Sequence, residues 1–418
     1  MSKPTFAGRN SSLLRAHNLR AVLNHLLRAG AISRAQLAER TTLSNTTITH
    51  LIDDLLAQGI VVEADAQPAR HNGADGHRRV GRPRTDLQLN PNARYAVGVH
   101  IGIGILRAAV VNLHAEIIHN AIVEFDTALA APLVLNQIAR LVKKTIASSR
   151  VPGDRILGIG VGASGLVDYD KGVNVLAPNL GWRELPLRDW MQSQLGLPVA
   201  VDNNVRAMAL GEAMFGAGRD VGVLAFVYGR VGVGAGFVVN GRPFRGSGAG
   251  AGEIGHTVML PDGGDPCMCG NRGCLETLVS EPVLVREAEK LVRRNPRGRL
   301  ARRFAQHNGS RPIERIFAAA RAGDADALAL IEARARYLGI ALANLVNVLN
   351  PELILLGGMF AQGSEFFLPT AERTMRERAF AGLGDRVRVQ PTKFGWRAGV
   401  IGAASLALST FFYHLEDA

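Results

Sequence analysis

The sequence has very few cysteines and lacks the long apolar run that a membrane segment requires. Only 3 of its 418 residues are cysteine, and no stretch of 18 consecutive apolar residues occurs. Without such a stretch we expect no transmembrane helix and no membrane partner. The arginines near the N-terminus do not belong to a signal peptide of the usual form, so we expect a cytoplasmic protein.

Negative charge is also scarce. The chain carries 36 acidic against 48 basic residues, which gives a formal net charge of +12. Such a surplus indicates an anionic partner, of which nucleic acid is the usual one. An arginine-rich proteome would produce the same bias without any partner, so both interpretations stay open. The length and the hydrophobic content of 47% suffice for two or three domains with cores of their own.

The three cysteines lie within a span of eight residues, and a histidine precedes them. Three thiolates and one imidazole form the closed tetrahedral set that structural zinc prefers. A disulfide is disfavoured, because the cysteines are odd in number and clustered in an apparently cytosolic chain. The pattern therefore predicts a structural Zn²⁺ ion held by His256, Cys267, Cys269 and Cys274. A chance cluster in a turn is the alternative, and a metal-sensing role for the same residues also stays open.

The N-terminal part of the chain has the periodicity of a small helical domain. Apolar residues at helical spacing predict a first helix, a short second helix over 34–40 and a third over 45–58. Ser33 and Ser44 stand where N-caps belong, and residues 60–62 form a short apolar strand. Helix, short helix, tight turn, helix and strand is the order of a winged helix-turn-helix, which binds double-stranded DNA.

The third predicted helix begins with small polar side chains. Such side chains can enter a major groove and hydrogen-bond base edges or phosphates, although capping and solvation of a surface helix would use the same residues. We predict DNA contacts at the start of this helix from Ser44, Asn45, Thr46, Thr47, Thr49 and His50.

A polar and basic stretch, residues 63–89, is expected to form a wing hairpin or a tether outside the packed core. Its Gly-Arg-Pro segment resembles the minor-groove clamp of AT-hooks, in which arginines enter a narrow, electronegative groove. Arg82 and Arg84 are therefore predicted DNA contacts, with a solvated linker as the alternative. A second basic segment, residues 286–303, is expected to be a solvated helix face, with DNA contact as the alternative.

The cysteine pattern is part of a longer motif. Glu253-x-Gly-His256 is followed by Cys267-x-Cys-Gly-x-x-Gly-Cys-x-Glu276, and this order resembles the signature of the ROK family of repressors and sugar kinases. The resemblance runs from about residue 95 to the C-terminus. It implies an α/β protein with a two-lobed actin/hexokinase-like (ribonuclease H-like) ATPase fold and a sugar cleft between the lobes.

The same resemblance bears on the domain organisation. Repressors of the family carry an N-terminal winged helix, whereas its plain kinases begin at the first strand. We therefore expect a winged helix-turn-helix domain with its wing or linker at 1–90. A sugar-kinase-like domain for effector binding and oligomerisation, which contains the zinc site, is expected at 91–418.

Three positions that the family uses for phosphoryl transfer are altered. The family's first hairpin has an Asp that orders Mg²⁺, and His100 stands there, although a hard cation prefers oxygen ligands. The family's catalytic base is an Asp, and Asn204 replaces it with an amide that cannot accept the proton. Val231 replaces the Thr of the second phosphate loop. These replacements predict that the chain is not an enzyme.

The sugar-binding positions of the family are better kept. The resemblance implies sugar contacts from a turn glycine, from two asparagines and from the acidic and histidine residues that flank the cysteines. Carboxylates and amides suit the recognition of hydroxyls because they are directional acceptors and donors. With the altered Asn204 added, the predicted sugar site consists of Gly165, Asn179, Asn203, Asn204, Glu253, His256 and Glu276.

Together these features predict a sugar-responsive, DNA-binding transcriptional regulator. It is expected to repress genes of carbohydrate metabolism, with a degenerate sugar-kinase domain as its sensor. Its expected partners are double-stranded operator DNA and a sugar or sugar derivative, and a homodimer or homotetramer is expected on a pseudo-palindromic site. The alternative is an active ATP-dependent sugar kinase with a fused DNA-binding domain.

Overall fold

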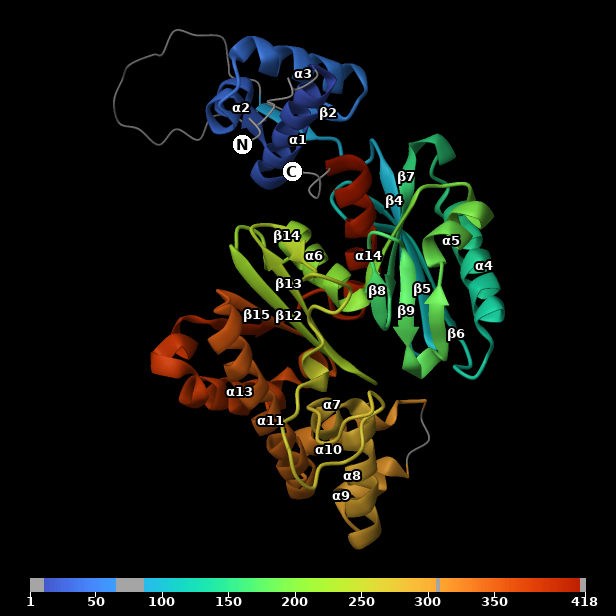
Figure 1. Ribbon diagram of the computed structural model, residues 1–418, viewed down its shortest axis with the longest axis vertical. Coiled ribbons are helices and arrows are strands. Elements are labelled where there is room, and N and C mark those ends of the chain that lie inside the picture. Colours follow the sequence, from blue (N-terminus) through green and yellow to red (C-terminus); the bar gives the residue numbers. More distant parts are fainter. Residues whose placement is uncertain (1–10, 65–85, 306–308, 414–418) are drawn as a thin grey trace, which may run out of the picture.

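The computed structural model describes residues 11–64, 86–305 and 309–413. A small N-terminal domain lies at one end of a larger body with two lobes (Figure 1). None of the helices in these three stretches combines the length and the apolar character that a membrane crossing requires.

The N-terminal domain packs three helices against a three-stranded sheet. The helices are α1 (Ser11–Ala29), α2 (Arg34–Thr41) and α3 (Asn45–Ala57), and the strands are β1 (Ile32–Ser33), β2 (Val61–Glu63) and β3 (Asp86–Leu89), in the order β1-β3-β2. Both predicted caps are confirmed. The Ser33 hydroxyl accepts the N–H of Gln36, and the Ser44 hydroxyl accepts the N–H of Thr47.

The stretch after β2 differs in part from its prediction. β3 pairs with both β1 and β2, and Leu87 and Leu89 are buried in the domain core. The end of the expected wing or tether is therefore packed, because its alternating polar and apolar residues form a half-buried strand. The predicted DNA contacts Arg82 and Arg84 lie outside the described residues.

The first lobe is built on a five-stranded sheet in the order β11-β7-β4-β5-β6. Its strands are β4 (Tyr95–Gly102), β5 (Ile105–Asn112), β6 (Ile117–Glu124), β7 (Ile156–Ala163) and β11 (Val199–Asn203). The first three form antiparallel hairpins, and β7 and β11 continue the sheet in parallel. α4 (Ala131–Ser149) covers one face, and α5 (Leu187–Leu195) packs beside it. A small sheet of β8 (Leu166–Asp168), β9 (Val173–Ala177) and β10 (Trp182–Leu185) extends from this lobe.

The second lobe has its own five-stranded sheet in the order β14-β13-β12-β15-β16. The strands are β12 (Val223–Gly229), β13 (Val233–Val239), β14 (Arg242–Phe244), β15 (Leu353–Gly358) and β16 (Arg388–Pro391). The long helix α11 (Ala325–Leu349) packs against α13 (Ser364–Arg378), and the remaining helices of this lobe are α7 (Glu276–Val279), α8 (Glu281–Arg294), α9 (Arg299–Phe304), α10 (Pro312–Arg321) and α12 (Met359–Gln362). α8 and α9, which carry the basic segment 286–303, lie at the end of the molecule opposite to the N-terminal domain (Figure 1).

Two helices pack against each other between the sheets of the two lobes. α6 (Asn204–Phe215) lies on the second lobe's sheet, and α14 (Ala398–Leu408) lies on β4 and β7 of the first. Every residue of α14 is buried. A Cβ atom at Gly160 would lie 1.8 Å from the carbonyl oxygen of Ala403, so only glycine allows the helix to come this close to the strand.

The N-terminal domain is packed against the body through a shared apolar cluster. This cluster contains Leu23 of α1, Val400 of α14 and Tyr413 of the helical segment η6 (Ser409–Tyr413). The Tyr413 hydroxyl donates to the carbonyl oxygen of Leu113 at 3.0 Å, which anchors η6 to the first lobe. The two domains therefore share part of one core.

A polar contact joins the two domains as well. Arg219, which follows α6, donates from Nη2 to the carbonyl oxygens of Leu27 and Arg28 at 3.0 Å each. Both carbonyls belong to the last turn of α1, where backbone acceptors have no partner within the helix. A cation at this end also interacts favourably with the helix dipole.

Candidate functional site

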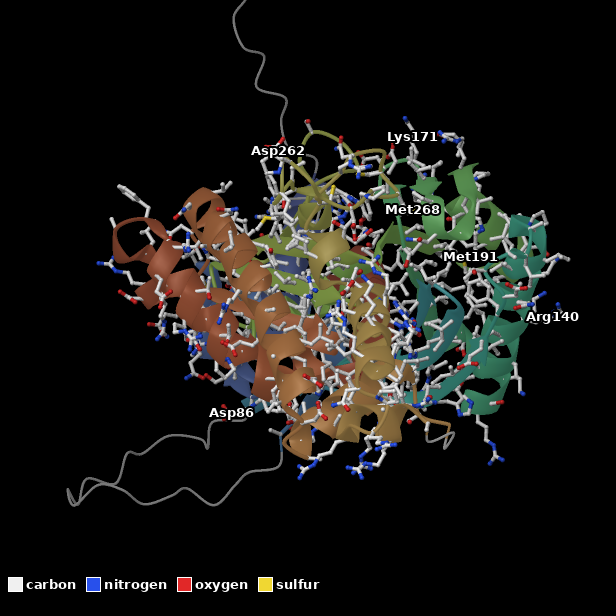
Figure 2. All side chains as sticks on the ribbon, turned by 90° about the horizontal axis from the view of Figure 1, so that it is seen from below. Asp86, Arg140, Lys171, Met191, Asp262 and Met268 are labelled. Atoms are coloured by element: carbon white, nitrogen blue, oxygen red, sulfur yellow. The ribbon has the colours of Figure 1, made fainter. Side chains whose placement is uncertain are left out.

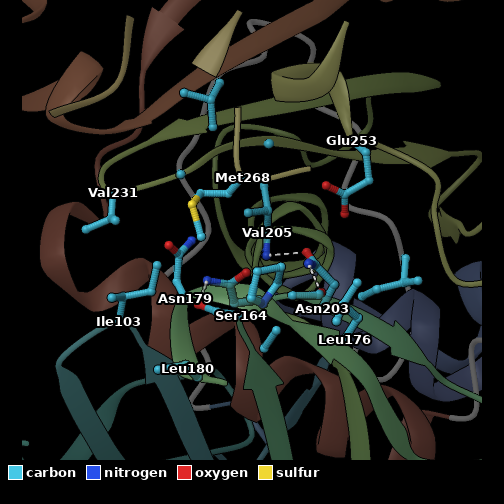
Figure 3. Close-up of a pocket in the computed structure, with 18 of the residues that line it drawn as sticks. Ile103, Ser164, Leu176, Asn179, Leu180, Asn203, Val205, Val231, Glu253 and Met268 are labelled. Carbon is cyan, nitrogen blue, oxygen red and sulfur yellow. Dashed lines mark hydrogen bonds between the residues drawn. The ribbon is translucent and has the colours of Figure 1, made fainter. Parts of the chain in front are cut away.

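A cleft of about 700 Å³ lies between the two lobes. Figure 3 shows Asn179, Asn203 and Glu253 around the same space. The structure brings all the predicted sugar-site residues to the lining of this cleft: Gly165, Asn179, Asn203, Asn204, Glu253, His256 and Glu276. They come from both lobes, so a ligand that contacts all of them would bridge the lobes.

The junction of β11 and α6 fixes two of these side chains. The Asn203 Oδ1 caps α6 by accepting the N–H groups of Val205 at 2.8 Å and Arg206 at 3.2 Å, and its Nδ2 donates to the carbonyl oxygen of Gly165 at 2.9 Å. One amide hydrogen of Asn203 is then left for a ligand. The neighbouring Asn204 donates from Nδ2 to the Ser164 hydroxyl at 3.3 Å.

A buried ion pair that the sequence analysis missed supports this junction. Arg206 and Asp202 are each 1% exposed, and the arginine Nε lies 2.7 Å from the Asp202 Oδ1. The Asp202 Oδ2 accepts from Arg245 at 2.9 Å, and the Nη atoms of Arg206 donate to the carbonyl oxygens of Val167 and Ala249. The network thus fixes three segments around the cleft. The spacing of four between Asp202 and Arg206 was its only signal in the sequence.

Glu276 connects the end of the cysteine segment to the second lobe's sheet. Its Oε2 accepts the N–H of Val233 at 3.0 Å, at the start of β13. Gly252 has a φ of +97°, and a Cβ there would lie 2.0 Å from the carbonyl oxygen of Ala235. Only glycine therefore lets the chain pass this close to β13 just before Glu253 enters the cleft.

The predicted metal ligands form a compact cluster beside the cleft. One ligand atom each from His256, Cys267, Cys269 and Cys274 lies within 4.8 Å of all the others. The Cys269 and Cys274 sulfurs are 3.7 Å apart, and the Cys267 sulfur lies 3.5 Å from Nδ1 of His256. A tetrahedral ion with metal–sulfur bonds of about 2.3 Å requires sulfurs about 3.8 Å apart, so the four side chains fit one metal ion.

His256 belongs to both the metal cluster and the cleft. Its Nδ1 faces the Cys267 sulfur, and its Nε2 lies 4.0 Å from the Glu253 carboxylate. An ion bound at Nδ1 would therefore fix the orientation of the ring whose other nitrogen lines the cleft.

Two hairpin turns form one end of the cleft. Ile103, at the tip between β4 and β5, and Val231, between β12 and β13, lie on the same side of the cleft (Figure 3). His100 also lines this end and is only 2% exposed. Burial, with the nearby charges of Arg107 and Arg230, lowers the pKa of His100 to about 3, so its ring is neutral at physiological pH.

The predicted DNA-contacting residues begin α3 and lie on the surface of the N-terminal domain. Five of them are exposed and Thr47 is half-buried. The Thr49 hydroxyl donates to the carbonyl oxygen of Asn45 at 2.9 Å, while Ser44 serves as the N-cap. Arg34 of α2 forms an ion pair with Asp53 of α3 at 2.9 Å. The helix is thus anchored, with its polar first turns open to a partner.

Family models match both domains of the chain. The model described as the ROK family matches residues 96–410, and the one described as winged helix-turn-helix DNA-binding matches residues 15–62. The first segment is the two-lobed body, and the second is the N-terminal domain up to β2.

Similar proteins have the same arrangement. A putative xylose repressor of Caldicellulosiruptor sp. (strain Rt8B.4) is 32% identical over 403 residues, which are 96% of this chain and 97% of the relative. The crystal structure of a ROK family transcriptional regulator, a homologue of the E. coli MLC protein, has a TM-score of 0.78 at 28% identity and covers 95% of this chain and 98% of its own.

A kinase structure matches the body alone. A ROK family glucokinase from Streptomyces griseus, solved with glucose and AMPPNP, has a TM-score of 0.67 at 30% identity and covers 75% of this chain and 98% of its own. The predicted combination of a winged helix-turn-helix with a two-lobed, hexokinase-like fold is thereby confirmed.

Proposed function

Since the chain belongs to the ROK family, we propose that it is a sugar-responsive transcriptional repressor of carbohydrate metabolism genes. The observation that carries the proposal is a winged helix-turn-helix domain that shares an apolar cluster with a sugar-kinase-like body. The similar xylose repressor, which matches over both domains, supports it. A repressor that binds operator DNA acts in the bacterial cytoplasm.

We propose that the cleft binds the sugar effector. Amide and carboxylate groups from both lobes line it, which suits the recognition of hydroxyls. A ligand that binds one arrangement of the lobes more tightly shifts the protein toward that arrangement. The difference in its binding free energy for the two arrangements limits the size of the shift. A change of about 10- to 100-fold in operator affinity needs a coupling of about 1.4 to 2.8 kcal/mol.

We propose that the metal cluster holds a structural Zn²⁺ ion. All four tetrahedral positions are taken by His256 and the three cysteines, which leaves no position for a substrate or water. The ion would stiffen the segment between Glu253 and Glu276. The structural role is favoured over metal sensing, because an ion with four protein ligands stabilises the fold and does not act as a switch.

We propose that the first turns of α3 enter the major groove of operator DNA. The exposure of Asn45, Thr46 and His50 supports this docking. A homodimer or homotetramer would present two such helices to a pseudo-palindromic site. Minor-groove contacts from Arg82 and Arg84 remain a prediction.

We propose that the body does not transfer phosphate from ATP. Asn204 offers an amide in place of a carboxylate base, a loss that typically costs about 10²- to 10⁴-fold in rate. His100 lies close to Arg107 and Arg230, and these cations oppose Mg²⁺ binding at this end of the cleft.

The second candidate function for this chain is that of an active sugar kinase, because the body is similar to a glucokinase. A coupled ADP-release assay with D-glucose and D-xylose separates the two. We expect no turnover above background, and turnover near the usual kinase range of about 1 to 100 per second would establish the kinase instead. Asn204→Asp is the informative companion variant, because it restores the carboxylate of the family's base.

Fluorescence anisotropy of the full chain on the DNA upstream of its own gene tests the repressor directly. We expect tight binding that weakens with salt, as phosphate contacts require, and that responds to one member of a sugar panel. The double variant Asn45→Ala with Thr46→Ala is expected to lose sequence-specific binding. Arg140→Gln, a change at an exposed position of α4 in the first lobe, serves as the control. A wild-type chain with no preference for its upstream DNA over random DNA would refute the proposal.

A further inference from the structure

The cleft between the lobes has two unlike ends. Polar groups gather at one end, where Asn203 and Glu253 face the same space (Figure 3). The other end is lined by apolar side chains from four separate segments, and the proposed sugar contacts include none of them. We call these four residues the apolar end: Ile103, Leu180, Val231 and Met268.

Two hairpin turns bring the apolar end together across the lobes. Ile103 lies at the tip between β4 and β5 in the first lobe, and Val231 lies between β12 and β13 in the second. Arg230 donates from Nη1 to the carbonyl oxygen of Ile103 at 3.3 Å, so the two tips meet. The Arg230 carbonyl accepts the N–H of Glu281 at 2.8 Å, which holds this turn at the start of α8. Contacts within the protein therefore set the positions of both apolar side chains.

Met268 reaches the apolar end from the cysteine segment. It stands between Cys267 and Cys269, and its side chain lies where this segment faces the first lobe (Figure 2). The side chain lines the cleft and is nevertheless 71% exposed. Methionine is unbranched and polarizable, so it adapts to the shape of an apolar ligand and makes favourable contacts with aromatic rings. It thus adds an adaptable wall to an end that is otherwise built from stiffer side chains.

We propose that the apolar end binds an apolar substituent of the effector, so that the effector is an alkyl or aryl derivative of a sugar rather than the free sugar. This inference rests on the proposed function, because it concerns the ligand of the same cleft. The polar end holds the hydroxyls of the sugar ring, and the substituent lies between Ile103, Val231 and Met268.

A free sugar leaves the apolar end without a matching group. The side chains of Ile103, Leu180 and Val231 offer no hydrogen bond, and a hydroxyl that leaves water without a partner costs free energy. An alkyl or aryl group instead gains free energy when these side chains cover it. The cleft of about 700 Å³ lies within the range of about 300 to 1,000 Å³ that is usual for drug-sized ligands. It therefore has room for a sugar ring together with its substituent.

Calorimetric titration of the full chain with matched pairs of sugar derivatives tests the apolar end directly. The probes are the methyl and phenyl glycosides of D-glucose and D-xylose in both anomers, together with 6-O-methyl- and 6-O-benzyl-D-glucose. We expect at least one aromatic probe to bind at least about tenfold more tightly than its methyl counterpart, because its ring is buried. If no aromatic probe binds more tightly than its methyl counterpart, the proposal is overturned.

Val231→Thr shows whether the gain arises at the apolar end. Threonine is close to valine in shape but places a hydroxyl beside the substituent, so we expect the advantage of the aromatic probe to fall at least about threefold while the methyl probe binds as before. Val123→Thr makes the same change on β6, where Val123 is 38% exposed, and is expected to keep the full advantage. An equal advantage in the two variants contradicts the proposal. If Val231→Thr loses the methyl probe as well, Met268→Gln decides by the same criterion, because an exposed side chain contributes little to folding.

Operator anisotropy with the same probes separates this inference from the proposed function. We expect the best aromatic probe to change operator affinity at a concentration at least about tenfold below that of free D-glucose or D-xylose. A free sugar that acts at the same concentration as its aromatic derivatives overturns the proposal while the sugar-responsive repressor stands, and so does a response to AMPPNP alone. A chain that does not prefer its upstream DNA refutes the proposed function, and the calorimetric comparison still decides the apolar end.

Discussion

At the scale of the residue, Asn203 has two tasks at the start of α6. Its Oδ1 caps the helix and its Nδ2 holds the turn at Gly165, while the residue also lines the cleft. Asn179, on the other side of the same space, lies in the short helical turn Pro178–Leu180. Truncation of the two asparagines should therefore have different effects.

We expect Asn203→Ala to lower the free energy of unfolding by about 1 kcal/mol, because the N-cap is lost, and to weaken the response to the effector. Asn179→Ala is expected to weaken the response without a comparable loss of stability. Urea unfolding and operator anisotropy on the same samples measure both effects. An equal loss of stability in the two variants would argue against the capping role.

A second prediction concerns the buried ion pair behind the cleft. Asp202→Ala leaves the fully buried guanidinium of Arg206 without its carboxylate, and we expect a loss of about 3 to 5 kcal/mol in urea unfolding. Lys171→Ala breaks the Lys171–Asp168 pair at 3.3 Å, in which the lysine is 78% exposed, and is expected to cost less than about 1 kcal/mol. Similar losses in both variants would mean that the Asp202 network contributes little.

At the scale of the element, α6 connects the cleft to the DNA-binding domain. Its first turn carries Asn204 into the cleft, and the chain just beyond its last turn carries Arg219 to the end of α1. A shift of α6 at the cleft would therefore move Arg219 and its contact with α1. The same shift would also act on α14, which packs along α6.

We therefore expect Arg219→Ala to bind operator and effector separately about as well as the wild type, but with a smaller effect of one on the other. Coupling of this kind is typically worth about 1 to 3 kcal/mol, and the loss of both hydrogen bonds should remove a measurable part of it. Operator titrations with and without effector measure the coupling, and Arg140→Gln is the control. An unchanged ratio of the two operator affinities would exclude a role of Arg219 in transmission.

The cysteine segment permits a test by metal removal. We expect a strong chelator to lower the thermal midpoint and to abolish the effector response, because His256 and the cysteines hold the segment that leads from Glu253 to Glu276. Added zinc should restore both. A metal sensor would instead lose DNA binding reversibly at constant helix content in circular dichroism.

At the scale of the whole molecule, sequence patterns predicted the local elements better than the contacts between distant segments. The metal cluster and the caps Ser33 and Ser44 were predictable because spacing alone brings their partners together. The seven cleft residues could be named only through a family resemblance, since their positions span more than one hundred residues.

Contacts between distant segments left no readable signal. Hydrophobic periodicity shows that a face is buried but not what covers it, so the packing of α1 on η6 and the bond from Arg219 to α1 could not be foreseen. Arg107 looked like any arginine on a strand. Only the pairing of β4 with β5 shows that it lies directly opposite His100.

The packing of α14 and η6 has a consequence for how the protein is made on the ribosome. Tyr413 binds the carbonyl of a residue 300 positions earlier, and α14 covers a sheet face whose strands leave the ribosome far sooner. A nascent chain that stops short of residue 398 leaves that apolar face uncovered. It also lacks α14 and η6, which share an apolar cluster with the N-terminal domain. We expect chaperones and proteases to recognise such a fragment, so the body becomes stable only after α14 has been translated.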